Sequence, residues 1–267
     1  MAEFNIIGSS PLRDDGPGKV SGRTEYIADM EIPGCWVGGI VRSGTARGKL
    51  RGIKKSSSFD WSKVTVVTHE DIPGENYISM VRNDYPALAE EEINYMSQAI
   101  ALVAAPDAKL LKEAMASLEP EIEPLKPVLT MEEALEGKEI IWGSDNIIDE
   151  YLNGAGDIEK GFAEADVIVE GDWATGFHEQ LYLETQGMAA LMREDGAVEI
   201  TGSLQCPFYV HGAIQKVMGL PPEKVIIKQA ATGGGFGGKE DYPSILGAYS
   251  ALLALRSGHP VRIVFDR

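Results

Sequence analysis

Short runs of apolar and β-branched residues recur along the first half of the chain and predict buried strands. These runs are CWVGGIV at 35–41, VTVVTHEDI at 64–72 and AIALVAA at 99–105. Such runs are typical of strands that are covered on both faces. The next segment, DAKLLKEAMASLEP from Asp107, places apolar residues at helical spacing between an N-cap residue and a proline, so it predicts a helix.

Glycine and proline divide this pattern into units. The opening stretch, residues 1–20, is rich in glycine, proline and aspartate and is expected to be an extended arm. The strands and the helix predict a compact unit over 21–125. The prolines of PEIEPLKPV (120–128) cannot continue a helix, so this segment is interpreted as leading into a linker, 126–150, and a second unit, 151–267.

The second unit shows the same signals. Asp157 is an N-cap residue, and Asp195-Gly196 is a turn dipeptide between two apolar stretches. The predicted elements are a helix in 157–165, a strand beginning near 167, a hairpin in 189–204, a helix at 207–218, a strand at 225–230, an apolar helix after 240 and a strand at 261–265. Because proteins usually avoid an exposed strand edge, we expect more polypeptide beside that last strand.

The charge composition of the chain disfavours some classes of binding partner. The net charge of -17 and the pI near 4.6 disfavour nucleic acid as a partner, since nucleic-acid binding depends on clustered lysine and arginine. The N-terminus has no basic region, and no apolar stretch reaches 18 residues, so neither secretion nor a membrane span is expected. An acidic cytoplasmic protein is the interpretation that fits best.

Cysteine and histidine give no metal pattern. Cys35 and Cys206 are the two cysteines, and they form no CxxC pair, so the chain is not expected to ligate an iron–sulfur cluster. His178 and Glu179 are adjacent and would point to opposite faces of a strand, so His178 is interpreted as a structural residue or as part of a polar core.

The segment ATGGGFGGKE, residues 231–240, is the most informative motif. Five glycines surround one phenylalanine between a predicted strand and an apolar helix. Glycine permits positive φ and lets backbone N–H groups approach a ligand closely, so this loop predicts contact with an anionic or oxo-bearing group.

Two nucleotide-binding patterns partly match the same loop. Gly233, Gly235 and Gly238 have GxGxxG-like spacing, but the loop is not in a first βαβ unit and no acidic residue follows at the required distance. Gly233, Gly238 and Lys239 nearly match the Walker pattern GxxxxGK(S/T), but Glu240 replaces the hydroxyl residue that binds magnesium. ATP or NAD binding is therefore not expected.

The chain resembles the molybdenum-binding subunit of the xanthine dehydrogenase and aldehyde oxidase family along nearly its whole length. The similar segments are RDDGPGKVSGRTEYIADMEIPG, HEDIPGENY, MSQAIALVAAPDA, GDIEKGFAEADVIVEGDW, QLYLETQGMAA, GSLQCPFYVHGAIQKVMGLPPEKVIIK and GGGFGGKE. The resemblance implies an α+β fold, with an α/β hammerhead-type domain followed by the first part of a molybdopterin-binding domain. The match is to the N-terminal portion of that subunit.

The resemblance also implies site residues. Gln205 matches the glutamine beside the molybdenum, whose amide can bond an oxo or hydroxo ligand. Gly235, Phe236 and Gly237 match the cofactor loop, with the Phe236 amide near the metal and its ring on the substrate pocket. Glu240 matches the carboxylate that contacts the heterocycle in purine-hydroxylating members. Each residue taken by itself also has a structural interpretation. Gln205 could be a strand-end residue that bonds a backbone group, Phe236 could be an anchor in the core, and Glu240 could be a charge favoured by a helix N-terminus.

The implied activity is oxidation of an N-heterocycle such as a purine with oxygen derived from water. No catalytic residue is expected within these 267 residues, because the family's general base, its later pterin-binding loops and its substrate-orienting arginine match nothing here. Iron–sulfur clusters and FAD are expected on partner subunits, and the rest of the molybdenum-binding subunit is expected as a further partner. The alternative is a non-catalytic module with the family fold that binds no cofactor by itself.

Overall fold

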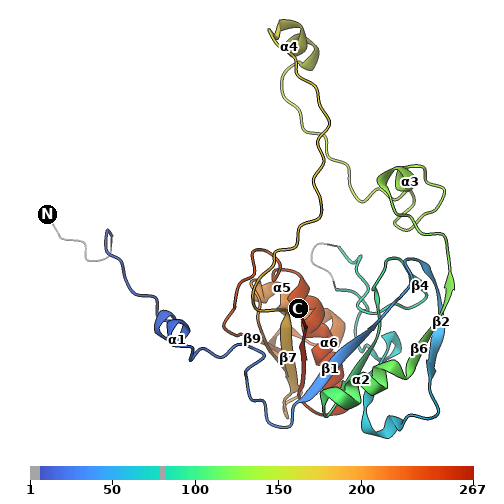
Figure 1. Ribbon diagram of the computed structural model, residues 1–267, viewed down its shortest axis with the longest axis vertical. Coiled ribbons are helices and arrows are strands. Elements are labelled where there is room, and N and C mark those ends of the chain that lie inside the picture. The colour runs from blue at the N-terminus through green and yellow to red at the C-terminus, as the bar shows by residue number, and fades with distance from the viewer. Residues whose placement is uncertain (1–6, 79–81) are drawn as a thin grey trace.

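The computed structural model describes residues 7–78 and 82–267 and has an α+β fold (Figure 1). Within these residues the main sheet has seven strands. Its order is β3 (Thr65–Val67), β5 (Ala99–Ala105), β1 (Trp36–Arg42), β10 (Val261–Val264), β7 (Gly187–Met192), β8 (Val198–Gly202) and β9 (Val225–Gln229). The pairs β1·β10 and β8·β9 are parallel and the other pairs are antiparallel.

A second sheet in the described residues has three strands. Its order is β4 (Glu92–Ile93), β2 (Gly48–Lys55) and β6 (Leu118–Pro124). The helices are α1 (Gly16–Val20), α2 (Ala108–Ala116), α3 (Met131–Leu135), α4 (Ile158–Glu164), α5 (Pro207–Met218) and α6 (Tyr242–Ser257), with short 3-10 turns at Trp61–Lys63, His69–Asp71 and Pro222–Lys224.

Helices cover both faces of β1. Adjacent strand residues point to opposite faces, and a Cβ on Gly38 would lie 3.0 Å from Leu253 of α6, whereas one on Gly39 would lie 2.5 Å from Met115 of α2. Both glycines therefore allow a close helix–strand approach. The main core lies between the sheet and the pair α5 and α6, and α6 is buried along most of its length.

Capping residues set the helix starts as the sequence predicts. The Asp107 carboxylate accepts from Leu110 N at 2.9 Å, and that of Asp157 accepts from Lys160 N at 3.0 Å. The hairpin of β7 and β8 turns at Gly196, whose φ is +79°. The helices α2, α4, α5 and α6 and the strands β1, β5, β9 and β10 confirm the predicted elements.

Several predictions were wrong. The arm contains α1 at its end, while its residues 1–6 lie outside the described part of the chain. Residues 118–124 form edge strand β6 and do not serve as a link, because an edge strand tolerates prolines whose missing N–H faces away from its neighbour. The strand predicted over 64–72 ends at Val67, where the Asp71 carboxylate accepts from Thr68 N at 2.9 Å and begins a turn.

Two further corrections concern strands of the second half. Residues 167–177 form no strand and are exposed. The last strand, β10, has no free edge, since it pairs with β1 on one side and β7 on the other. Strands from both sides of the predicted linker thus share one sheet. The segments that carry α3 and α4 extend away from this body (Figure 1).

Candidate functional site

The glycine loop, residues 231–240, leaves the end of β9 and enters α6. Its backbone has positive φ at Gly234 (+101°) and Gly237 (+91°), and also at Phe236 (+50°). A bulky residue seldom adopts this left-handed conformation, and such strain persists only where surrounding contacts impose it. The contacts around the loop are therefore the first feature of the site.

Three glycines of the loop pack directly on side chains of the body. A Cβ on Gly233 would lie 2.6 Å from Glu184 Cβ, and one on Gly238 would lie 2.5 Å from the Tyr182 ring. A Cβ on Gly235 would overlap the Gln205 amide. The glycine content of the motif thus serves close packing of the loop as well as its positive φ angles.

Gln205 fixes the far side of the loop. Its backbone N donates to Lys239 O at 2.7 Å, and its Oε1 accepts from Gly237 N at 3.2 Å and Lys239 N at 3.1 Å. Because both loop groups are donors, the carbonyl end of this amide must face the loop. Its Nε2 has no acceptor in the described part of the chain, so it remains available to donate to a ligand.

A buried ion pair lies beneath the loop. Lys239 is fully buried, and its Nζ donates to Glu184 Oε2 at 2.8 Å and to Ser203 Oγ at 2.9 Å. The ammonium also lies 4.9 Å from the centre of the Tyr182 ring. A lysine held in this way is not free to bind phosphate, which removes the main support for a nucleotide-binding loop.

The outward side of the loop carries Phe236, which is 77% exposed, together with the exposed residues Gly237 and Glu240. Within residues 7–78 and 82–267, the Phe236 amide donates to no acceptor. Because its side chain is exposed, Phe236 is not a core anchor.

Cys206 lies next to Gln205 in the chain. Partial burial, and then the charges of Glu240 and Asp241, raise the pKa of the Cys206 thiol above its ordinary value.

Other parts of the described structure offer less chemistry. Among the residues described, no group of three or more histidine, cysteine and acidic side chains could hold a metal ion. His178 is exposed, so its predicted place in a polar core was wrong. No helix formed by the described residues has both the length and the apolar character needed to cross a membrane.

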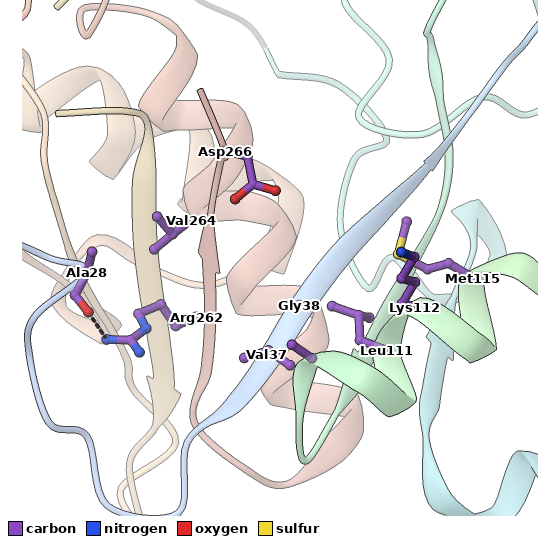
Figure 2. Close-up of a pocket in the computed structure, with 10 residues that line it drawn as sticks. Ala28, Val37, Gly38, Leu111, Lys112, Met115, Arg262, Val264 and Asp266 are labelled. Carbon is purple, nitrogen blue, oxygen red and sulfur yellow. Dashed lines mark hydrogen bonds between the residues drawn. The ribbon is translucent and has the colours of Figure 1, made fainter. Parts of the chain in front are cut away.

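A hollow of about 530 Å³ lies between β1, β10 and α2 (Figure 2), and the residues that line it do not include the glycine loop. Val37, Leu111 and Met115 contribute apolar lining. Arg262 points toward the N-terminal segment, where its guanidinium donates to the carbonyls of Ile27, Ala28 and Met30 at 2.8–3.1 Å. These bonds tie that segment to the sheet.

Known proteins share this architecture. The family model of the aldehyde oxidase and xanthine dehydrogenase a/b hammerhead domain matches residues 21–126. The model of the molybdopterin cofactor-binding domain matches residues 143–267, which include the glycine loop. The chain belongs to the molybdenum-binding xanthine dehydrogenase and aldehyde oxidase family.

Relatives and solved structures of this family agree with the assignment. A probable xanthine dehydrogenase subunit of Bacillus subtilis is 31% identical over 95% of this chain and 34% of its own length. The nicotinate dehydrogenase large molybdopterin subunit of Eubacterium barkeri is 30% identical over 99% of this chain and 62% of its own length. The chain therefore spans less than two thirds of either relative. The aldehyde oxidoreductase from Desulfovibrio gigas superposes with a TM-score of 0.80 at 25% identity, over 95% of this chain and 30% of that one.

The donor set at the loop fits the molybdopterin group of this family. Among the residues that the structure describes, Gln205 Nε2 and Phe236 N have no acceptor, and none comes within 4 Å of a Cβ added at Gly237. Amide donors of this kind suit oxo and phosphate groups. The residues named from the sequence thus lie together on the glycine loop and on the connection between β8 and α5, and their contact with the cofactor stays a prediction.

Sequence reasoning missed the residues beneath the loop. Tyr182, Glu184 and Ser203 lie in segments that carried the resemblance, QLYLETQGMAA and GSLQC, but no role was assigned to them. The available signals were a glutamate, Glu184, that directly follows a leucine, and a lysine, Lys239, at the end of a glycine loop. Neither residue by itself shows that the two form a buried pair.

Proposed function

We propose that this chain supplies one wall of the molybdenum and substrate pocket of a xanthine dehydrogenase-like molybdenum hydroxylase. The observation that carries this proposal is the orientation of Gln205, whose carbonyl oxygen is held by the loop while its Nε2 stays free. In this proposal, Gln205, Gly235, Phe236 and Gly237 bind the molybdenum cofactor. When bound, that cofactor supplies the redox centre for oxidation of the substrate with oxygen derived from water.

The substrate class is proposed to be an N-heterocycle such as a purine. Two of the similar proteins are named for xanthine and nicotinate dehydrogenases, and both names denote N-heterocyclic compounds. The exposed Phe236 ring offers an apolar face for such a ring to pack on. The Glu240 carboxylate is exposed and would accept a hydrogen bond from a heterocyclic N–H.

The partners are proposed to be the rest of the molybdenum-binding subunit and companion chains that carry iron–sulfur clusters and FAD. Two relatives are named as subunits of larger dehydrogenases, which supports an assembly of several chains. Many large apolar side chains are exposed between residues 129 and 183, and a partner that covered this segment would bury them. The chain alone is expected to be inactive and, with two free cysteines, cytoplasmic.

The test is the molybdenum and pterin content of the purified chain, alone and after co-expression with its genomic neighbours. We expect one molybdenum and one pterin per chain in the complex and neither in the isolated chain. Gln205→Ala should lower the content about tenfold, as expected for a ligand-orienting group. The matched control, Gln215→Ala in α5, should leave the content unchanged.

Absence of molybdenum and pterin from both preparations would contradict the proposal. The chain would then be a folded module of the family that carries no cofactor.

A further inference from the structure

A single carboxylate oxygen beneath the glycine loop holds both ends of the loop. Glu184 Oε2 accepts from Gly233 N at 2.7 Å, where the loop begins, and from Lys239 Nζ at 2.8 Å, where it ends. Ser203 Oγ, just beyond β8, donates to the same oxygen at 2.6 Å. The Lys239 cluster, defined as Glu184, Ser203 and Lys239, therefore connects the loop to the sheet through one atom.

The Lys239 cluster and Gln205 restrain the loop from two directions. Gln205 Oε1 binds the amides of Gly237 and Lys239, while Glu184 Oε2 binds the amide of Gly233. Between these anchors stands Phe236, with its unused amide and its strained φ. The ion pair thus acts on the segment that presents the cofactor-facing donors.

A contribution to the free energy of folding does not by itself explain a buried ion pair at this place. Lys239 is fully buried, and removing a charge from water costs free energy that a well-packed apolar side chain would avoid. In the described part of the chain, the buried Glu184 Oε1 and the neighbouring Gln186 Oε1 accept no hydrogen bond. Incompletely satisfied polar groups are expected where geometry is maintained at the expense of stability.

We propose that the Lys239 cluster is a positioning device that holds the glycine loop in the one backbone conformation able to present Gln205 Nε2 and Phe236 N to the molybdenum cofactor. This inference rests on the proposed function for what the loop binds. Glu184, Ser203 and Lys239 are positioning residues, since they act through the loop and do not face the ligand side.

The test is hydrogen–deuterium exchange of the loop amides in the purified full chain, measured relative to α6. Lys239→Met should speed exchange of the 233–239 peptide at least tenfold relative to α6. The double variant E184Q/K239M removes both charges but keeps an acceptor for Gly233 N, so it should restore much of the protection. The matched control is Lys228→Met, which removes an exposed lysine paired with Glu199 and should leave loop exchange unchanged.

Ser203→Ala keeps the test valid if Lys239→Met does not fold. It removes one hydroxyl from the cluster and should speed loop exchange roughly fivefold, the equivalent of one ordinary hydrogen bond. The inference is overturned if loop exchange in the variants equals wild type, or if it rises only in proportion to exchange in α6.

Molybdenum content of the co-expressed complex separates this inference from the proposed function. A Lys239→Met complex that loses both loop protection and molybdenum supports the positioning role. A second outcome is that the wild-type complex contains no molybdenum while loop exchange still speeds up in Lys239→Met. That result would contradict the proposed function and the part of the inference that concerns the cofactor, but it would support the positioning of the loop. A loaded Lys239→Met complex with normal loop exchange overturns the positioning role and leaves the proposed function intact.

Discussion

Gly235 and Gln205 are in direct contact at the centre of the site. The Gln205 amide occupies the space that a Cβ on Gly235 would need, and its oxygen binds two loop N–H groups. A methyl group at residue 235 would therefore push away the side chain whose orientation carries the proposed function.

Gly235→Ala is expected to lower the molybdenum content of the co-expressed complex about tenfold, as displacement of an orienting group commonly does. Elemental analysis per polypeptide measures the effect. Gly212→Ala in α5 is the control, since an added Cβ there meets nothing within 4 Å. Equal molybdenum in both variants would contradict the role given to Gln205.

The pKa of the Cys206 thiol depends in part on the charge of Glu240. The carboxylates of Glu240 and Asp241 disfavour the thiolate and add to the effect of burial in raising the pKa of Cys206. Glu240→Gln should therefore lower that pKa and speed alkylation of Cys206 at pH 8, because a larger fraction of the thiol is then thiolate. The measurement uses a Cys35→Ser background, and the gain should vanish well above the thiol pKa, where both proteins are thiolate. An unchanged rate would mean that the two side chains lie apart in solution.

The sequence names Gln205, Phe236 and Glu240 as residues of the candidate site, but it does not show what supports them. The prediction for these three residues rests on the glycine loop and on the family resemblance, and their contact with a cofactor stays a prediction. Glu184 and Lys239 were missed because they are far apart in sequence, and only the fold brings their side chains to 2.8 Å. The sequence pattern also does not show that Glu184 and Ser203 bind the Lys239 ammonium, which is why this lysine is not free to bind a phosphate group.

At the scale of elements, the segment around Gly74 caps the end of α5. Gly74 N donates to Val217 O at 3.0 Å and Glu75 N donates to Lys216 O at 2.9 Å, which satisfies carbonyls that a helix end leaves free. These bonds join a loop of the first half to a helix of the second. An added Cβ at Gly74 would overlap the backbone at Lys216.

Gly74→Ala should lower the free energy of unfolding by roughly 2–3 kcal/mol, through overpacking and lost capping bonds. Urea unfolding followed by circular dichroism measures this change. Gly44→Ala is the matched control, because an added Cβ there has open space, and it should cost under about 0.5 kcal/mol. Equal stability of the two variants would show that the cap contributes little.

Elements with strong local signals were predicted well, and those that depend on partners were not. β5 and α5 followed from an apolar run and from a proline-led helix pattern. β2 was missed because a register shift between Leu50 and Gly52 breaks its alternation and its exposed side is basic. Residues 167–177 have a strand-like composition, but in the described structure no strand lies beside them.

At the scale of the whole molecule, the body and the extended segment differ sharply. One sheet unites both halves through the parallel pair β1·β10, whereas residues 129–181 have mostly exposed side chains and few contacts with the body. Local opening is easiest where few apolar contacts hold the chain. The extended segment is therefore expected to open long before the sheet.

Limited trypsin digestion of the isolated chain should cut after Lys138 and Lys160 before any site in residues 25–126 or 184–267. The side chains of these lysines are 70% and 67% exposed. Co-expressed partners should slow these cuts, since the same segment carries the exposed apolar side chains proposed to contact them. Early cleavage at Lys109 in α2 would contradict this picture of the fold.

The division into a hammerhead-type unit and a molybdopterin-binding unit stays a prediction at this scale. The two matched models end and begin at residues 126 and 143, yet strands on both sides of that gap form one sheet. Local sequence patterns show where segments differ in composition, but they do not show that β10 inserts between β1 and β7.

A structure of the co-purified complex with its molybdenum cofactor bound would show directly whether the glycine loop faces that cofactor. We expect the molybdenum group to lie against residues 231–240, beside Gln205 and Phe236, with Lys239 still paired to Glu184 beneath the loop. A cofactor bound elsewhere, with the glycine loop facing solvent, would contradict this expectation.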